Sequence, residues 1–214
     1  MTRPRLASTI FAACLIAAGA AHAEITIGVS LGTTGPGASL GIPYKNAFTL
    51  VPKTLGGEPV RYIILDDESK PDGAAKNARK FVNEDKVDAL MGSTGVPSAV
   101  AMAQVAAEFK TPIVSLTPLP PLASERAHWT FIVPQPTELM MSAVAQHMKA
   151  KGVKKVGFIG FSDTWGDLVY NAITTLAPDH GYQVVTNERY GRADTSVVGQ
   201  VLKIMAAAPD AVVV

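Results

Sequence analysis

The chain has 214 residues, of which 48% are hydrophobic and only 17% are charged, and its formal net charge is +1. This length allows one sizeable domain or two small ones. The near-neutral charge provides no basic surface for nucleic acid, and a single cysteine excludes a disulfide framework within the chain.

Residues 1–23 have the three parts of a secretory signal peptide. These are a positive start, MTRPR, an apolar run, LASTIFAACLIAAGA, and the small residues AHA, which fit cleavage after Ala23. The apolar run is short for a membrane anchor, and Cys14 lies inside it rather than at its end, which argues against lipidation. Cleavage would remove Arg3 and Arg5 and leave 17 basic and 18 acidic residues. We therefore expect a cysteine-free protein that is exported across the inner membrane.

The stretch GTTGPGAS follows the first expected strand, Ile25–Leu31. Its glycines have the spacing of a phosphate-binding P-loop, but Ala38 stands where the lysine would be. The dinucleotide fingerprint G-x-G-x-x-G is not matched either. We interpret the stretch as a strand-to-helix turn that needs a permissive backbone near Gly35.

Short apolar strands and amphipathic helices then alternate. After a helix at 39–55, in which Ser39 is a possible N-cap, we expect strands at 60–66, 87–91 and 112–116 and helices at 71–84 and 98–110. This order favours a parallel sheet with helices on both faces. Five prolines in residues 117–136 predict a loop that crosses to a second unit.

The second unit repeats the alternation. We expect helices at 137–152, 165–177 and 195–207 and strands at 155–160 and 182–189, with the terminal DAVVV starting another strand. With only three strands there, we expect the chain to be incomplete relative to its architecture. The expected parts are a signal peptide at 1–23, an N-terminal α/β lobe at 24–122, a proline-rich crossing at 123–136 and a partial second α/β lobe at 137–214.

The stretch MGSTGVPSAV, residues 91–100, combines a strand end, a small polar loop and a helix start. A helix N-terminus offers free backbone N–H groups and partial positive charge, so it can bind an anion without a lysine. Thr94 and Ser98 would add hydroxyl groups, and Ser98 would also cap its helix. Ligands of open α/β sheets bind beyond the carboxyl ends of the strands, where this loop would lie.

Two other strand ends carry candidate ligand-binding residues. Ser115 and Thr117 in VSLTP either face the same crevice or fill small core positions, and the sequence leaves both alternatives open. Trp165 in FSDTWGDL is either a cap on the core or a flat apolar wall for a ligand, and its place at a strand end favours the wall.

Evidence for an enzyme is weak. No G-x-S-x-G motif is present, and the acidic run DDE at 66–68 is better explained as a solvated strand end than as paired catalytic carboxylates. The histidines lack metal-binding spacing, at positions 128, 147 and 180. We expect no catalytic residues, no metal site and no cofactor.

Taken together, the chain resembles the periplasmic substrate-binding proteins of the branched-chain amino acid (Leu/Ile/Val-type) ABC transporters, from about Glu24 to its end. The similar stretches, in order, are ITIGVSLGTTGPGASLG, DDESKPDGAAKNARKFV, GVKKVGFIGFSDTWG, GYQVV and ERYGRADTSVVGQVLKIMAAAPDAVVV. The resemblance implies the type I periplasmic-binding fold, with two Rossmann-like doubly wound lobes, the second incomplete here. It also places the T-G-P turn at the mouth of a cleft between the lobes.

The resemblance further implies where a ligand binds. The carboxylate of an amino acid or related acid would dock on the first lobe near Thr94, Gly95 and Ser98, and the loop with Ser115 and Thr117 would add polar contacts. Trp165, in place of the more usual tyrosine, would close over the ligand from the second lobe. Because Leu40 and SLTPLPPL depart from the amino-acid-binding pattern, an aromatic or aliphatic carboxylate is equally credible.

The implied function is a non-enzymatic component of an ABC importer. Such a protein would act as a monomer, close on its ligand and deliver it to an inner-membrane permease, without nucleic acid as a partner. A ligand-sensing module of the same fold in a receptor or regulator is the alternative. An exported hydrolase on a Rossmann-like sheet would need a nucleophile and base pair, which the sequence does not offer.

Overall fold

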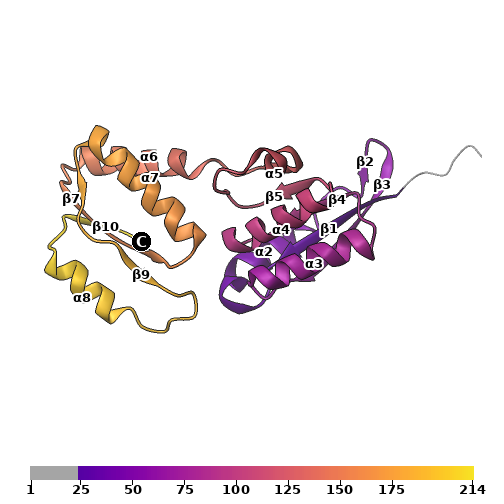
Figure 1. Cartoon of the computed structure of the whole chain (residues 1–214), viewed down its shortest axis with the longest axis horizontal. Helices are drawn as coiled ribbons and strands as arrows, with labels where there is room; N and C mark the ends of the chain where they lie inside the picture. Colours follow the sequence, from indigo (N-terminus) through magenta and orange to yellow (C-terminus); the bar gives the residue numbers. More distant parts are fainter. Residues whose placement is uncertain (1–23) are drawn as a thin grey trace, which may run out of the picture.

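The computed structural model describes residues 24–214. The expected signal peptide and its cleavage site lie outside the described residues. Strands and helices alternate along the chain and form two sheets, which confirms the α/β class (Figure 1). One sheet has six strands in the order β2-β3-β1-β4-β5-β6, and the other has four strands built around β7.

The first sheet is parallel except for its short edge strand β2. The central strand β1 lies between β3 and β4, and all its residues after Ile25 are buried. The strands are β1 (Ile25–Leu31), β2 (Thr54–Leu55), β3 (Glu58–Asp66), β4 (Ala89–Gly92), β5 (Ile113–Ser115) and β6 (Thr130–Ile132).

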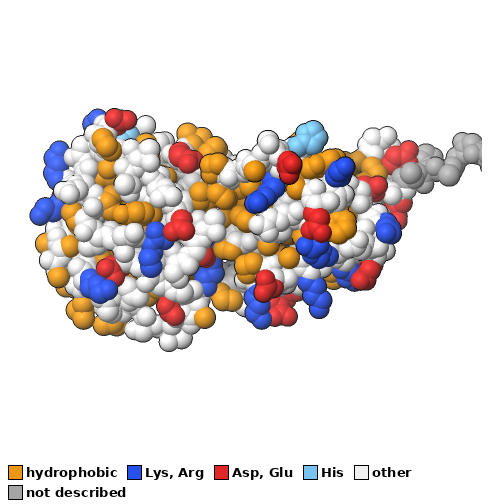
Figure 2. All heavy atoms as spheres, in the orientation of Figure 1, with side chains coloured by type: hydrophobic (Ala, Val, Ile, Leu, Met, Phe, Trp, Pro, Cys, Tyr) orange, Lys and Arg blue, Asp and Glu red, His pale blue; other side chains and the backbone are white. Residues whose placement is uncertain are grey.

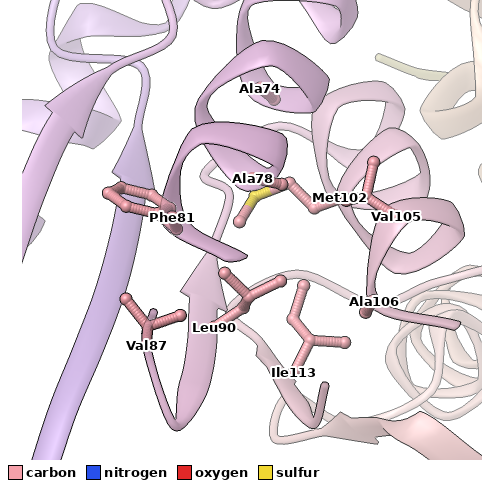
Figure 3. Close-up of a cluster of buried hydrophobic side chains, with 9 residues drawn as sticks. All are labelled: Ala74, Ala78, Phe81, Val87, Leu90, Met102, Val105, Ala106 and Ile113. Carbon is pink, nitrogen blue, oxygen red and sulfur yellow. The ribbon is translucent and has the colours of Figure 1, made fainter. Parts of the chain in front are cut away.

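Apolar clusters cover both faces of this sheet. On one face, α3 (Pro71–Asn83) and α4 (Val96–Glu108) pack on each other and on β4 and β5, and their buried side chains meet in one cluster (Figure 3). On the other face, alternate residues of β1 form a second cluster that includes Val29 and Leu31. Phe48, at the end of α2 (Ala38–Ala47), packs against it.

Gly28 sets how closely α3 approaches β1. A Cβ atom at Gly28 would lie 2.5 Å from Cγ of Phe81, well inside contact distance. Phe81 is fully buried and lies on the inner face of α3. The missing side chain in the strand therefore makes room for a large aromatic side chain of the helix.

The second sheet is parallel throughout. Its core is formed by Phe158 of β7 and by Val169 and Ile173 of α7. The elements are α6 (Thr137–Ala150), β7 (Lys155–Phe161), α7 (Thr164–His180), β8 (Gln183–Val184), β9 (Glu188–Tyr190), α8 (Val198–Ala206) and β10 (Ala211–Val213).

The single strand expected at 182–189 is wrong, because β8 and β9 pair separately with β7. Between them, both the carbonyl and the hydroxyl oxygen of Thr186 accept from the backbone N–H of Phe158, at 3.3 and 3.2 Å. One N–H of β7 is thus shared between a backbone and a side-chain acceptor, where a regular ladder has a backbone acceptor alone. The run of extended backbone is therefore interrupted at this residue.

The expected loop at 117–136 is also wrong in its middle. It contains the short helix α5 (Ser124–Trp129) and strand β6, which pairs in parallel with β5 and extends the first sheet. The five prolines lie on either side of these elements, where no ladder hydrogen bond is required of them. The chain passes to the second sheet only after β6 (Figure 1).

Two expected helix caps are corrected by the structure. Helix α4 begins at Val96 with Gly95 as N-cap, so Ser98 lies inside the first turn and is not the cap. Pro97 explains the earlier start, because proline fits the first turn of a helix, where its missing N–H is not needed. Helix α2 follows directly from the short 3-10 turn η1 (Gly35–Gly37), so Ser39 is not a cap either.

The permissive backbone expected near Gly35 is confirmed. Gly35 has φ of 74°, and a Cβ atom there would lie 2.4 Å from the carbonyl oxygen of Glu68. Within residues 24–214, no helix is both long enough and apolar enough to cross a membrane.

Candidate functional site

A cleft lies between the two sheets. It consists of two adjoining pockets, each with a cavity volume of about 240 Å³, which share Leu40, Thr94, Gly95 and Arg192. Every lining residue comes from a segment that follows a strand: β1, β3, β4 and β5 in the first sheet, and β7 and β9 in the second, including the last residue of β7. The cleft therefore occupies the carboxyl edges of both parallel sheets, where ligands of this architecture bind.

The first turn of α4 opens into this cleft. Its N-cap, Gly95, has extended backbone and makes no side-chain cap, and Gly95, Val96 and Ser98 all line the cavity. The N–H groups at a helix start have no partner within the helix. Because Pro97 carries no N–H, the donors on offer are those of the other residues in the turn.

Thr94 connects this loop to the first strand. Its hydroxyl oxygen accepts a hydrogen bond from the backbone N–H of Gly32 at 3.2 Å. Its own proton remains to be donated, and the residue lines both pockets. Ser98 lines one pocket and is 3% exposed.

The structure separates Ser115 from Thr117. Ser115 is fully buried, and its hydroxyl donates to the carbonyl oxygen of Thr117 at 2.8 Å, so it shapes the turn and does not line the cleft. Thr117 does line the cleft, and its hydroxyl oxygen is buried with no hydrogen-bond partner. Of the two alternatives left open for this pair, the core position holds for Ser115 and the crevice for Thr117.

Trp165 lies both against the core of the second lobe and along the cleft. It lies in the first turn of α7, and its side chain packs against the second-lobe core formed by Phe158, Val169 and Ile173. It also lines the cleft together with Leu40 and Pro118. The indole is thus both a cap on the core and an apolar wall of the cavity.

Arg192 was missed by the sequence reasoning. It lines both pockets from the loop after β9, its Nε lies 2.6 Å from Oδ2 of Asp163, and its guanidinium carbon lies 4.1 Å from the ring centre of Phe161. The available signal was an arginine in the segment RYGRAD, between the last expected strand and the next helix. Arg192 follows both the expected strand and β9, but nothing in the local sequence shows that this loop reaches the cleft.

A buried carboxylate lies behind the first-lobe loops. Asp67 is 1% exposed, so its interpretation as part of a solvated strand end is wrong. Its Oδ2 accepts from the hydroxyls of Ser93 at 2.6 Å and Ser30 at 3.0 Å, and its Oδ1 accepts from the backbone N–H of Ser69 at 3.0 Å. Burial raises the pKa of Asp67, although these hydrogen bonds oppose the shift.

The bonds of Asp67 hold together the ends of three strands. They join β1, β3 and the loop after β4, directly before Thr94. Ser69 continues the connection, because its hydroxyl donates to Thr34 and accepts from the backbone N–H of Gly37. Buried charge is expensive unless it is hydrogen-bonded, so this network fixes the loops that form the first-lobe side of the cleft.

The described residues contain no group of three or more histidine, cysteine, aspartate or glutamate side chains that could hold a metal ion. On the face shown in Figure 2, positive and negative side chains are intermixed rather than gathered by sign.

Solved structures with this fold come from bacterial ligand-binding proteins. An extracellular ligand-binding receptor from Rhodopseudomonas palustris HaA2 matches with 47% identity and a TM-score of 0.86, over 89% of this chain and 53% of that chain. A second receptor from the same strain matches with 43% identity and a TM-score of 0.82, over 89% of this chain and 54% of that chain. The chain therefore spans about half the length of these structures.

More distant structures share the fold alone. The solute-binding protein of an R. palustris ABC transporter, solved in complex with 4-hydroxybenzoate, matches with 22% identity and a TM-score of 0.78, over 89% of this chain and 53% of that chain. No curated protein matches the chain.

The family model for periplasmic binding proteins matches residues 24–214, which is the whole described part of the chain. Both this family and the similar solved structures are ligand-binding proteins rather than enzymes. The chain therefore belongs to the periplasmic binding protein family and has its type I fold.

Proposed function

We propose that this chain is the solute-binding component of an ABC importer and captures a small carboxylate between its two lobes. The observation that carries the proposal is the uncapped first turn of α4, which opens into the cleft at Gly95 and Ser98. Family membership implies a periplasmic location, and a permease in the inner membrane is the proposed partner.

The first turn of α4 suits a carboxylate for electrostatic reasons. Its N–H groups and the positive end of the helix dipole favour an anion by about 0.3–1 kcal/mol at an exposed site and up to about 2 kcal/mol in a partly buried one. The hydroxyls of Thr94 and Ser98 stand beside these donors and can take the remaining acceptor positions. One carboxylate could therefore be held without a lysine.

The rest of the cleft suits an apolar ligand body. Leu40, Pro118 and Trp165 line the same pocket as Thr94 and Thr117. Burial of apolar ligand surface against these side chains would supply affinity, at about 25 cal/mol per Å² before the costs of binding. An amino acid with an apolar side chain and an aromatic or aliphatic acid both fit this description.

Binding would act through closure of the two lobes. The cleft takes residues from both sheets, so a ligand that contacts both sides stabilises the closed arrangement. A ligand-sensing module of the same fold would bind in the same cleft, and only its protein partner would differ.

The test is calorimetric titration of the full-length protein with leucine, 4-methylpentanoate, phenylalanine, 3-phenylpropanoate, benzoate and 4-hydroxybenzoate. Each acid that binds is compared with its primary amide, which keeps the shape and removes the charge. We expect saturable binding of at least one acid and at least tenfold weaker binding of its amide. Equal affinity for acid and amide, or no binding by any acid, would refute the proposal.

A further inference from the structure

The second lobe holds an aspartate at the cleft whose carboxylate accepts three hydrogen bonds from its own lobe. Asp163 is the N-cap of α7, and its Oδ1 accepts from the backbone N–H of Trp165 at 2.9 Å and of Gly166 at 3.2 Å. Its Oδ2 accepts from Nε of Arg192 at 2.6 Å. Both oxygens therefore accept hydrogen bonds, and the two backbone bonds fix the direction of the carboxylate.

This fixed carboxylate holds Arg192 in place. The guanidinium lies over the ring of Phe161, with its carbon 4.1 Å from the ring centre, so one face is covered and one edge is paired. A guanidinium has five N–H donors, of which Nε supplies one. No hydrogen bond joins the two Nη atoms to the described part of the chain, residues 24–214. This outer edge is the one that presents paired donors to a carboxylate.

Arg192 and the first turn of α4 meet at the same cavity from opposite lobes. Arg192, Thr94 and Gly95 line both pockets of the cleft. The two positive groups are independent, because one is a helix terminus of the first sheet and the other a side chain of the second. A carboxylate between them has enough acceptor positions to bond with both.

The charges that line the described part of the cleft disfavour an α-ammonium group. Among the described residues that line the cleft, Asp163 is the only acid, and its negative charge is already paired with Arg192. An α-ammonium group lies next to its carboxylate, so it would be held close to the guanidinium and to the positive end of α4. Repulsion would then be added to the loss of its hydration.

We infer that Arg192 is the second-lobe cation of the site and that the ligand is a carboxylate with an apolar body and no α-ammonium group. This inference rests on the proposed function and narrows its ligand class. Asp163 is a positioning residue in this account, because it holds Arg192 and does not itself contact the ligand.

The ligand class is tested with two pairs that differ only in the ammonium group, namely 4-methylpentanoate with leucine and 3-phenylpropanoate with phenylalanine. Calorimetric titration of the full-length protein is expected to give at least tenfold tighter binding for the acid of a pair. Equal or tighter binding of the amino acid would overturn the inference and leave the proposed function standing. Absence of binding by every acid and amino acid tested would overturn both.

The role of Arg192 is tested with R192Q and R192K. We expect R192Q to weaken binding of the acid at least tenfold and to reduce the ratio between acid and amide, and R192K to recover part of the affinity. R79Q is the matched control, because Arg79 also pairs with a carboxylate, that of Glu108, and lies over an aromatic ring, that of Phe109. Wild-type affinity and an unchanged acid-to-amide ratio in R192Q would contradict the role, and thermal melting shows whether each variant is folded.

Discussion

Trp165 shows how one side chain can serve both the fold and the site. The indole caps the second-lobe core around Phe158 and Ile173 and also forms a wall of the cleft. The sequence placed it at a strand end and favoured the wall, but it could not show that the same side chain also packs on the core. Side chains of this size commonly contribute to two environments at once.

Removal of the indole is expected to weaken ligand binding. In W165A the apolar wall is lost, and the affinity for a carboxylate with an apolar body should fall by about tenfold or more, which corresponds to about 1.4 kcal/mol. W129A is the matched control, since Trp129 lies in α5 beside a different groove. Calorimetry on both variants checks the expectation, and wild-type affinity in W165A would remove this residue from the site.

The pair Asp66 and Asp67 shows the limit of sequence reasoning at single residues. Two adjacent acids at a strand end look alike in the sequence, yet Asp67 is buried behind the cleft and Asp66 lies nearer the surface. Alternation along the strand turns them in different directions, and the serines that satisfy Asp67 come from distant positions in the chain. Local pattern carries no information about those partners.

Asp66 gives a prediction for the pH dependence of stability. Partial burial acts to raise the pKa of Asp66, but hydrogen bonds from the Thr34 hydroxyl and nearby backbone N–H groups together lower it below its ordinary value of 3.8. The ionised carboxylate therefore stabilises the fold above about pH 3.8, and this contribution is lost as the pH falls through the lower folded value. Urea denaturation of wild type and D66N should show a steeper acid loss in the wild type. Parallel pH profiles would contradict this assignment.

At the scale of elements, the sequence predicted the order of strands and helices better than the residues at which they begin and end. The alternation of strands and helices, the first strand and the helix after MGSTG were all predicted. The start of α4 was placed two residues too late, because Ser98 was taken as its cap, whereas proline at position 97 is favoured in a first turn. The loop that carries Arg192 could not be assigned to the cleft, because its approach depends on how the two sheets face each other.

Asp163 has two roles, as the N-cap of α7 and as the partner of Arg192, and substitutions can separate them. Asparagine is as good an N-cap as aspartate, so D163N should keep the start of α7, whereas D163A should lower the free energy of unfolding by about 1 kcal/mol relative to D163N. Both variants lose the ion pair with Arg192, so both should bind the carboxylate more weakly than the wild type. Urea denaturation and calorimetry measure the two effects separately. Equal stability of the Ala and Asn variants would exclude the capping role.

At the scale of the whole molecule, the cleft depends on both sheets together. The first sheet contributes a helix terminus and hydroxyl groups, and the second contributes an aromatic wall and a guanidinium. Because both sheets are parallel, their carboxyl edges can face one another, and every lining segment follows a strand (Figure 1). The sequence predicted this arrangement through its alternating pattern and its resemblance to the family, but not the contacts made across the cleft.

The most direct test is a crystal structure of the full-length protein with a bound carboxylate identified by calorimetry. We predict that a carboxylate oxygen lies about 3 Å from N–H groups of the first turn of α4 at Gly95–Ser98, with the apolar body of the ligand against the indole of Trp165. A ligand bound elsewhere, or with its carboxylate directed away from that turn, would contradict the account.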